Sequence, residues 1–513
     1  RLAALDRPSH QQVKALIHRI VGPTVSKVDV LRGYRSLVSR GVLKEQHGIL
    51  SALCLKPVRT VSGVTPVAVM TEPHACPGSC IFCPDFENMP KSYITDEPGA
   101  LRGLQLAFDP YRQTTHRIQA LTTIGHVTDK IELIVLGGTW SSYPRAYQER
   151  FVRRCFDGMN GAESSDLIEA QRHNETSTHR NVGLSIETRP DLITVDEAAW
   201  LRRLGVTKVQ IGLQSLDDAI LAMNRRGHTS DDTRRSFAIL RAAGFKIHAH
   251  WMPNLLGATP ESDLADFARL WGDPAIRPDE LKIYPCSLIA GTGLYRLWER
   301  GDFAPYSDDI LVDLLARCKA MIPPYCRVTR LMRDIPVHHI EAGCKNTNLR
   351  QTVRKHMAAH GLHCGCIRCR EVRVSEIDPE SLVLDDTTYE TPTSVEHFLS
   401  FVSLSSSPAP SRLAAFLRLS LPKETATGII LPELRGSAVI REVHVYGPSL
   451  PLGSHAPHAQ HCGLGTRLLE ESERVATSAG FGQLSVISAI GTRPYYRTRG
   501  FALGELYMHR GIG

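Results

Sequence analysis

The sequence has no stretch of about 18 uncharged apolar residues, the minimum for a membrane-spanning helix. It also has no early apolar run that resembles a secretory signal peptide. These absences argue against a membrane partner and favour a cytoplasmic protein. The chain begins at Arg1 without an initiator methionine, so we expect the natural start to lie upstream.

Acidic residues are scarce in residues 1–60, which contain three acids against 11 Lys and Arg. That segment has a net charge of +8, whereas the whole chain has +7, so residues 61–513 together carry only −1. A basic segment joined to a neutral body indicates a polyanion partner, although a solvated helical face is an equal alternative. The candidate contacts are Lys14, Arg19, Lys27, Arg32, Arg35, Arg40 and Lys44.

The 13 cysteines do not suit a disulfide framework, because their number is odd and no secretory signal is present. Six of them form two tight clusters, which favours metal ligation in a reducing compartment.

Short apolar runs alternate with amphipathic stretches between residues 61 and 330, which predicts a parallel sheet, open or curled into a partial (β/α) barrel. The pattern changes near residue 380, where a separate α/β domain is expected. The predicted domains are a helical basic arm (1–60), the barrel (61–330), a linker (331–379) and the C-terminal domain (380–513). The expected barrel strands are Pro66–Met70, Ile131–Leu136, Val182–Ile186, Lys208–Leu213, Lys246–His250 and Leu281–Tyr284.

The first cluster, Cys76-Pro-Gly-Ser-Cys80-Ile-Phe-Cys83, follows the first expected strand. Three thiolates on one loop suit a [4Fe–4S] cluster whose fourth iron stays open for S-adenosylmethionine (SAM). The alternatives are a zinc site with a distant fourth ligand, or buried free thiols. Candidate SAM-binding residues lie near the carboxyl ends of other strands, where ligands of parallel sheets bind: Gly137, Gly138, Thr139, Glu187, Arg189, Gln210, Gln214 and Met252.

The second cluster has the spacing C-x-C-x2-C and comprises Cys364, Cys366 and Cys369. Structural zinc takes four ligands, so one must come from elsewhere. Cys286 is favoured over Cys344 and His363, with plain thiols or a second iron–sulfur cluster as alternatives.

The stretch Gln460-His-Cys-Gly463-Leu-Gly465 precedes an expected helix. Its glycines let backbone amides surround a pyrophosphate at a helix N-terminus, which predicts acetyl-CoA binding in a GNAT-type domain. Tyr495 and Tyr496 are candidate catalytic residues, because a tyrosine there can touch the thioester. His444 is either a catalytic base or a strand histidine whose ring is simply hydrogen-bonded within the protein.

These motifs, in this order, resemble the catalytic subunit of Elongator over most of residues 56–513. The stretches that carry the resemblance include Pro73–Cys76, Thr114–Ile118, Leu136–Thr139, Ile186–Pro190, Asn224–His228, Gly291–Tyr295, Arg333–Pro336, Arg441–Gly447 and Gly491–Arg493.

The resemblance implies a tRNA uridine carboxymethyltransferase of the acyltransferase class. A SAM-derived radical takes hydrogen from the acetyl-CoA methyl group, the resulting carbon adds to C5 of the wobble uridine, and thioester hydrolysis releases CoA. The basic arm then binds the anticodon stem-loop, and a bacterial or archaeal member needs no accessory subunits, although a homodimer is possible. The implied acetyl-CoA contacts are Lys130, Glu442, Val443, His444, Val445, Gln460, Gly463, Leu464, Gly465, Thr466 and Tyr496.

Two other functions compete with this one. A protein lysine acetyltransferase uses the GNAT domain alone, and a non-catalytic tRNA-binding module retains only the folds. Intact cluster cysteines argue against both. The shared chemistry also predicts one cleft between the two domains, because direct reaction needs contact distance.

Overall fold

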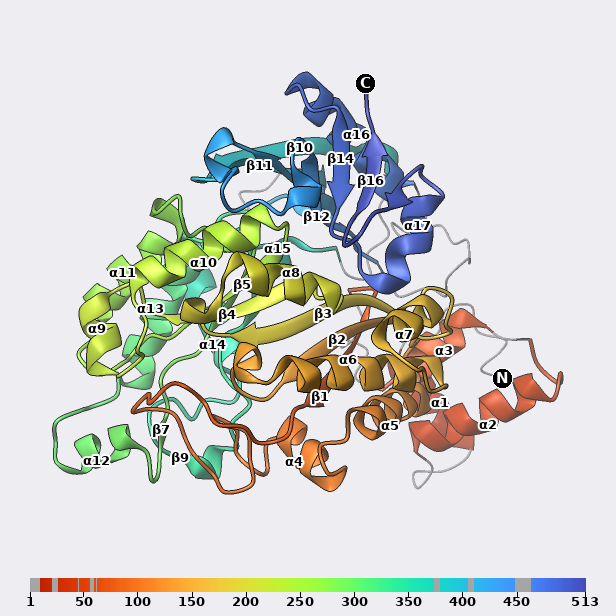
Figure 1. Ribbon diagram of the computed structural model, residues 1–513. Coiled ribbons are helices and arrows are strands. Elements are labelled where there is room, and N and C mark those ends of the chain that lie inside the picture. The colour runs from red at the N-terminus through yellow and green to blue at the C-terminus, as the bar shows by residue number, and fades with distance from the viewer. Residues whose placement is uncertain are drawn as a thin grey trace.

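The computed structural model describes residues 10–20, 26–44, 46–55, 60, 62–372, 379–404, 410–447 and 463–513 (Figure 1). Among these residues, no helix has both the length and the apolar character needed to cross a membrane.

A seven-stranded parallel sheet forms the centre of the molecule, and its strands follow chain order from one edge to the other. It confirms the predicted partial (β/α) barrel, and each of the six expected strands is present. Pro66 lies in an edge strand, where its missing N–H costs no interior sheet hydrogen bond. The strands are β1 (Thr65–Met70), β2 (Lys130–Leu136), β3 (Arg180–Thr188), β4 (Lys208–Gln214), β5 (Lys246–Trp251), β6 (Glu280–Ile283) and β8 (Arg327–Arg330).

Helices connect successive strands and bury apolar stripes against the sheet. Gly205 and Gly244, just beyond two of them, have φ of 90° and 75°, as expected of helix-ending glycines. The helices between barrel strands are α4 (Pro98–Gln105), α5 (Pro110–Thr123), α6 (Arg145–Asn160), α7 (Leu167–Asn174), α8 (Val195–Arg203), α9 (Asp218–Met223), α10 (Ser230–Ala242), α11 (Pro260–Gly272), α12 (Gly293–Glu299) and α13 (Asp308–Ala320).

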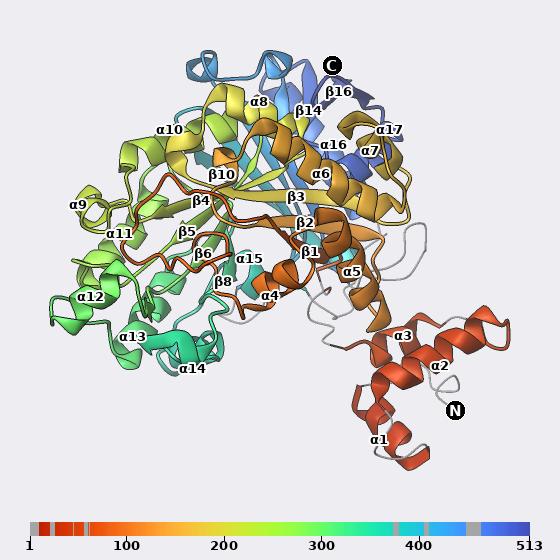
Figure 2. The same cartoon turned by 60° about the horizontal axis from the view of Figure 1, so that its bottom comes forward.

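The basic arm contains α1 (His10–Ile20), α2 (Lys27–Ser39) and α3 (His47–Leu53), with a small core of its own around Val13, Ile17 and Leu31. Figure 2 shows these helices standing apart from the rest of the molecule. Arg35 of α2 donates to the carbonyl of Thr122 on α5 at 2.5 Å, which docks the arm on the barrel.

The segment after β8 holds a 3₁₀ turn, η5 (Val337–His339), and then β9 (Ile340–Ala342), which pairs antiparallel with β7 (Leu288–Ile289). The helices α14 (Leu349–Ala359) and α15 (Ile367–Arg370) follow.

The C-terminal domain is a second seven-stranded sheet, antiparallel except where β13 pairs with β14. That parallel pairing covers only Ala438–Ile440 on β13, so the rest of β13 diverges from β14 and leaves a gap in the sheet. Its elements are β10 (Leu382–Glu390), β11 (Ser394–Ser403), β12 (Arg412–Pro422), β13 (Ala438–Val445), α16 (Leu464–Ser478), β14 (Gln483–Val486), η9 (Ile490–Thr492), α17 (Arg493–Arg497), β15 (Ala502–Leu503) and β16 (Met508–Gly511).

The C-terminal domain packs on the amino ends of the barrel strands. Lys246, at the start of β5, pairs with Glu442 of β13 at 2.5 Å. Asp279, just before β6, forms two 2.8 Å contacts with the guanidinium of Arg441, and both side chains are fully buried. Buried apolar side chains of the two domains join in one continuous core.

Candidate functional site

A cavity of about 850 Å³ passes through the barrel from the cysteine loop to the C-terminal domain. Cys76, Cys80 and Cys83 line it at the carboxyl ends of the strands, whereas Glu442, His444 and Tyr496 line it at the amino ends. One cavity therefore holds residues of both predicted chemistries, as the expectation of a shared cleft requires.

The cysteine loop follows β1, and positive charge lies against it. Arg226 Nη1 lies 3.0 Å from Cys80 Sγ, and Arg226 Nη2 donates to the carbonyl of Gly212. A Cβ built on Gly78 would lie 2.4 Å from Nη1 of Arg189, so the backbone there tolerates only glycine unless this guanidinium moves. The buried Arg189 Nη1 has no hydrogen-bond partner among the described residues, and this polar atom is available to a ligand.

The thiol spacing fits a cluster better than a single ion. Among the described residues, the groups of three or more whose ligand atoms lie within 4.8 Å of one another do not include Cys76, Cys80 and Cys83. A four-iron cluster holds its thiolates further apart than one ion does, because iron and sulfide stand between them.

The turn after β2 brings backbone close to the cysteine loop. Gly137 and Gly138 have φ of 126° and 83°, and a Cβ on Gly137 would lie 1.9 Å from Thr71 Oγ1. Thr139 Oγ1 then lies 3.6 Å from Cys76 Sγ. Gly138 and Thr139 line the cavity, and Gly137 does not; the approach of their backbone to SAM stays a prediction.

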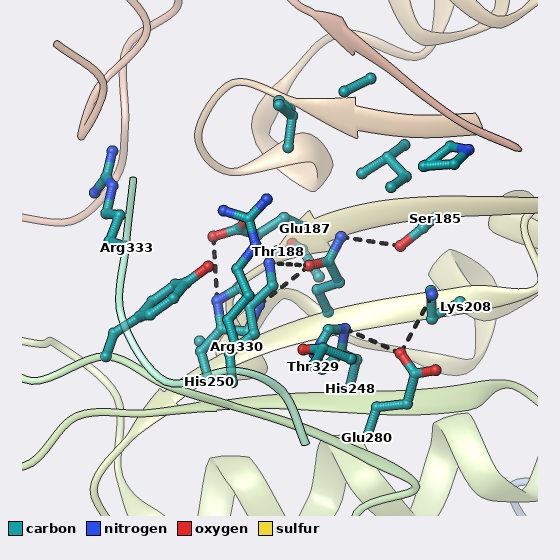
Figure 3. A pocket seen from close by; sticks show the side chains of 18 of the residues that line it. Ser185, Glu187, Thr188, Lys208, His248, His250, Glu280, Thr329, Arg330 and Arg333 are labelled. Atoms are coloured by element: carbon teal, nitrogen blue, oxygen red, sulfur yellow. Dashed lines mark hydrogen bonds and ion pairs between the residues drawn. The ribbon is translucent and has the colours of Figure 1, made fainter. Parts of the chain in front are cut away.

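A polar network crosses the cavity between β3, β4, β5 and β6 (Figure 3). His250 lies between Glu187 and Gln210, with Nδ1 3.4 Å from Glu187 Oε1 and Nε2 3.2 Å from Gln210 Oε1. Lys282 donates to the same Gln210 oxygen, and Gln210 Nε2 donates to Ser185 Oγ at 2.9 Å. Gln214, Arg189 and Met252 also line this end of the cavity.

Burial and neighbouring charges fix the protonation of this network. Burial lowers the pKa of His250 to about 4, with a further contribution from the Lys282 charge. Burial raises the pKa of Glu187, but His250 and Lys282 outweigh it and bring the pKa to about 2. Burial lowers the pKa of Lys282 to about 8 against the opposing effect of Glu187.

A second set of charges lies at the middle of the passage. Lys208 contacts Glu132 and lies 3.2 Å from Glu280, and His248 Nδ1 lies 3.3 Å from Glu280 Oε2 (Figure 3). Lys246 lies 3.5 Å from Glu280 and links this set to Glu442 of the C-terminal domain.

The acetyl-CoA candidates gather at the diverging strands. Glu442, Val443, His444 and Tyr496 line the cavity, and His444 Nε2 donates to the Ser62 carbonyl at 3.0 Å. That bond fits the alternative in which His444 is simply hydrogen-bonded within the protein. Burial lowers the pKa of His444 to about 4.

The amino end of α16 lies beside this wall of the cavity. Gly463, at φ 77°, precedes the helix, and a Cβ on Gly465 would lie 2.8 Å from the hydroxyl of Tyr495. The guanidinium of Arg499 lies 3.6 Å from the centre of the Tyr495 ring and donates to Thr466 Oγ1 at 3.3 Å. Leu464 is buried.

Of the predicted acetyl-CoA residues, only Glu442, Val443, His444 and Tyr496 line the cavity. Gln460 lies outside the described residues. Lys130 begins β2, Val445 ends β13, and Gly463, Leu464, Gly465 and Thr466 form the amino end of α16; none of these belongs to the cavity lining. Burial lowers the pKa of Lys130.

Comparison with known proteins identifies the family. Residues 73–270 match the radical SAM superfamily, and residues 278–359 match the radical SAM C-terminal domain. The tRNA uridine(34) acetyltransferase of Methanocaldococcus jannaschii is 40% identical over 98% of this chain and 94% of its own. Elongator complex protein 3 of Danio rerio is 39% identical over 91% of this chain and 87% of its own. This chain belongs to the Elongator complex protein 3 family.

A solved member of the family has the same fold. The structure of archaeal Methanocaldococcus infernus Elp3 with N-terminus deletion (1-46) superposes with a TM-score of 0.76 at 37% identity, covering 88% of this chain and all of that one. Membership of the radical SAM superfamily implies a [4Fe–4S] cluster and SAM, and the free Arg189 atom and the thiol spacing described above fit both.

The second cysteine cluster has the compactness of a single-ion site. The thiols of Cys364, Cys366 and Cys369 lie within 4.8 Å of one another. Cys286 is not among them; it follows β6 and lies in a separate apolar cluster with Leu255 and Leu288. The three-cysteine group therefore does not include Cys286, the expected fourth ligand. Cys326 is nearer: its carbonyl accepts from Ile367 N at 2.9 Å, and the Cys366 charge adds to burial in raising the pKa of Cys326.

The predicted basic contacts of the arm divide into two groups. Lys27 donates to the Ala52 carbonyl within the arm, and Arg35 donates to the Thr122 carbonyl of α5, so both already have structural roles. The side chain of Lys14 lies outside the described residues. The exposed members of the set are Arg19, Arg32, Arg40 and Lys44.

Sequence reasoning missed Lys282, His250 and Arg226 as site residues. A signal was present, because polar residues recur at every second position of otherwise apolar strands. The pairs are Lys208 and Gln210, His248 and His250, and Glu280 and Lys282. Such inward-facing positions line a barrel interior.

Proposed function

We propose that this protein modifies uridine 34 of tRNA by transferring a carboxymethyl group derived from acetyl-CoA to C5. The relatives named tRNA uridine(34) acetyltransferase support the substrate. The observation that carries the proposal is the single cavity lined by both Cys76 and Tyr496, since it gives an acyl donor and a radical source one common space.

When bound, a [4Fe–4S] cluster on Cys76, Cys80 and Cys83 with SAM supplies a carbon-centred radical for hydrogen abstraction. In this proposal Gly138 and Thr139 approach the SAM amino group through their backbone. Arg189 Nη1 binds the SAM carboxylate, because it is buried and has no hydrogen-bond partner among the described residues. Glu187 stays ionised beside His250 and accepts hydrogen bonds from ribose hydroxyls.

Beside the other end of the cavity, backbone amides at the amino end of α16 donate hydrogen bonds to the CoA pyrophosphate. Tyr496 lines the cavity, and in this proposal its hydroxyl donates a hydrogen bond to the thioester oxygen. Its hydroxyl remains protonated, because burial raises the pKa of Tyr496. Zn²⁺ on Cys364, Cys366 and Cys369 has a structural role in this proposal, and the anticodon stem-loop contacts the exposed Lys and Arg side chains of the arm.

An anaerobic assay with reconstituted protein, dithionite, SAM, acetyl-CoA and bulk tRNA tests the proposal. Digested nucleosides are read by mass spectrometry. Cys80→Ala should abolish carboxymethyluridine, and Tyr496→Phe should lower its rate roughly tenfold or more through loss of one donor. Cys54→Ala and Tyr111→Phe, which alter a cysteine and a tyrosine outside the cavity, should retain activity.

Two outcomes would contradict the proposal. One is a modified nucleoside that forms without SAM. The other is CoA release that needs neither SAM nor Cys80 and is accompanied by acetylated lysine, which would favour a protein lysine acetyltransferase.

A further inference from the structure

The barrel sheet is open, with β1 and β8 at its two edges. The segment that follows each edge strand crosses the opening and meets the other. Arg333, after β8, donates to Ser92 Oγ at 2.7 Å and pairs with Glu97 at 2.9 Å, and both partners come from the segment after the cysteine loop. These contacts hold the segment after the cysteine loop against the segment that follows β8.

A compact group of metal-ligating side chains lies on the same seam. Asp96 comes from the segment after β1, and His338 and His339 form the end of η5 after β8. His338 Nε2 lies 2.9 Å from Asp96 Oδ2, and His339 Nε2 lies 2.8 Å from Asp96 Oδ1. The three ligand atoms lie within 4.8 Å of one another, as do those of the cysteine group around Cys366.

The arrangement is partly fixed before any ion binds. His339 is one quarter exposed, and its ring packs edge-on against Phe86 with centroids 6.3 Å apart. Both imidazoles present Nε2 to the same carboxylate from one short turn. To bind an ion between the three groups, each Nε2 must lose its proton so that its lone pair can coordinate the ion. The rings need move only slightly.

We propose that Asp96, His338 and His339 form a site for a borderline divalent cation of the Zn²⁺ class, which fastens the two edges of the open barrel together. Two imidazole nitrogens and one carboxylate oxygen are donors that suit Zn²⁺, Co²⁺ and Ni²⁺. Three protein ligands leave a position for water, because four-coordinate zinc needs one more. The site is separate from the cysteine group and from the cavity lining.

The cation's effect follows from its place. Without the cation, the Asp96 carboxylate holds the two histidines only through hydrogen bonds that are exposed to solvent. Such exposed pairs contribute little to stability. With it, residues on either side of the seam share one ion. The segment between the cysteine loop and Asp96 then loses freedom to move away from β8.

Cobalt titration tests the site in the cluster-loaded protein, prepared without a histidine tag. Co²⁺ bound to cysteine gives intense thiolate charge-transfer absorption, whereas Co²⁺ at Asp96, His338 and His339 gives only weak visible bands. We expect one equivalent of the second kind. Replacing groups that merely orient a metal ligand typically costs about 10–100-fold in affinity, so His339→Ala and Asp96→Asn should cost at least that much.

His356→Ala is the matched control, because His356 also faces a carboxylate, Asp313, at 3.3 Å but belongs to no three-ligand group among the described residues. It should bind Co²⁺ as the parent does. Amide hydrogen exchange gives a second readout: Zn²⁺ should slow exchange in residues 84–97 of the parent and leave it unchanged in His339→Ala. Absence of thiolate-free Co²⁺ binding in the parent, or its persistence in His339→Ala, would overturn the proposal.

Discussion

At the residue scale, His228 illustrates how burial controls charge beside the cavity. It is 5% exposed, and its Nε2 donates to the Leu213 carbonyl at 3.3 Å. Burial lowers its pKa to about 4, and the charges of Arg226 and Arg189 lower it further. The ring is therefore neutral at pH 7, which keeps another positive charge away from the two arginines.

Replacing His228 should change how stability depends on pH. The folded pKa is about 4 and an unfolded histidine titrates near 6.5, so the unfolded chain binds the proton first. Stability from the neutral ring is complete above about pH 6.5 and falls by up to about 3 kcal/mol as pH drops through 4. His228→Asn should flatten the free energy of unfolding between pH 4.5 and 7, measured in denaturant. His173→Asn, which replaces an exposed histidine, should leave this pH dependence unchanged. The same pH dependence in the parent and both variants would contradict a buried neutral His228.

Individual site residues differed in how far sequence could place them. The spacing of Cys76, Cys80 and Cys83 predicts a cluster loop because all three ligands are local. The alternation of polar and apolar residues marks Lys282 and His250 as inward-facing, but their contacts with Gln210 on another strand depend on the fold and are encoded in no local pattern. Cys286 was assigned to the zinc group from its place after a strand, but the fold brings Cys326 closer to Cys366.

At the element scale, η9 contacts β3 backbone to backbone. A Cβ on Gly491 would lie 2.6 Å from the Arg180 Cβ, 2.8 Å from the Asn181 carbonyl oxygen and 3.0 Å from the Asn181 nitrogen. No flexible side chain can move aside there. The contact fixes the C-terminal domain on the amino end of a barrel strand.

Gly491→Ala should therefore separate η9 from β3 and disturb the wall that carries Tyr496. We expect destabilisation of about 1–3 kcal/mol, typical of overpacking, together with weaker acetyl-CoA binding. Calorimetric titration and denaturant unfolding measure the two effects. Gly482→Ala has open space around its Cβ and should change neither; a Gly491→Ala variant with parental affinity and stability would contradict this contact.

The strands of the barrel were easier to predict from sequence than the exposed edge strand of the second sheet. The barrel strands read clearly because parallel strands are buried on both faces. The edge strand β10, by contrast, is exposed along most of its length, and its sequence from Leu382 to Glu390 gives little apolar signal. Sequence therefore indicated a separate α/β domain from near residue 380 without delimiting β10.

At the scale of the whole molecule, Asp279 ties the two domains together. Arg441 forms two contacts with it, and Arg418 Nη1 lies 3.4 Å from Oδ1. Burial raises the pKa of Asp279, but the two arginines outweigh it and hold the pKa well below its usual range. These partners are more than a hundred residues apart, so sequence could predict two domains but not how they dock.

Asp279→Asn should remove the carboxylate that Arg441 and Arg418 share, leaving Arg441 paired with Glu396 and Arg418 paired with Glu442. Breaking a buried pair in this way typically costs about 3–5 kcal/mol. Thermal and denaturant unfolding should show that loss. Asp231→Asn, which removes an exposed partner of Arg234, should cost less than about 1 kcal/mol. Similar effects of the two substitutions would show that the interface does not depend on Asp279.

The common cavity has a consequence for the sequence of events in a turnover. In the proposed reaction, an anticodon loop at the cysteine end covers the SAM site, whereas acetyl-CoA binds at the opposite end of the passage. SAM must then enter before the RNA, and its products must leave after it. Steady-state kinetics should show inhibition at high tRNA concentration that added SAM relieves. Random-order kinetics without such inhibition would mean that SAM has another way in.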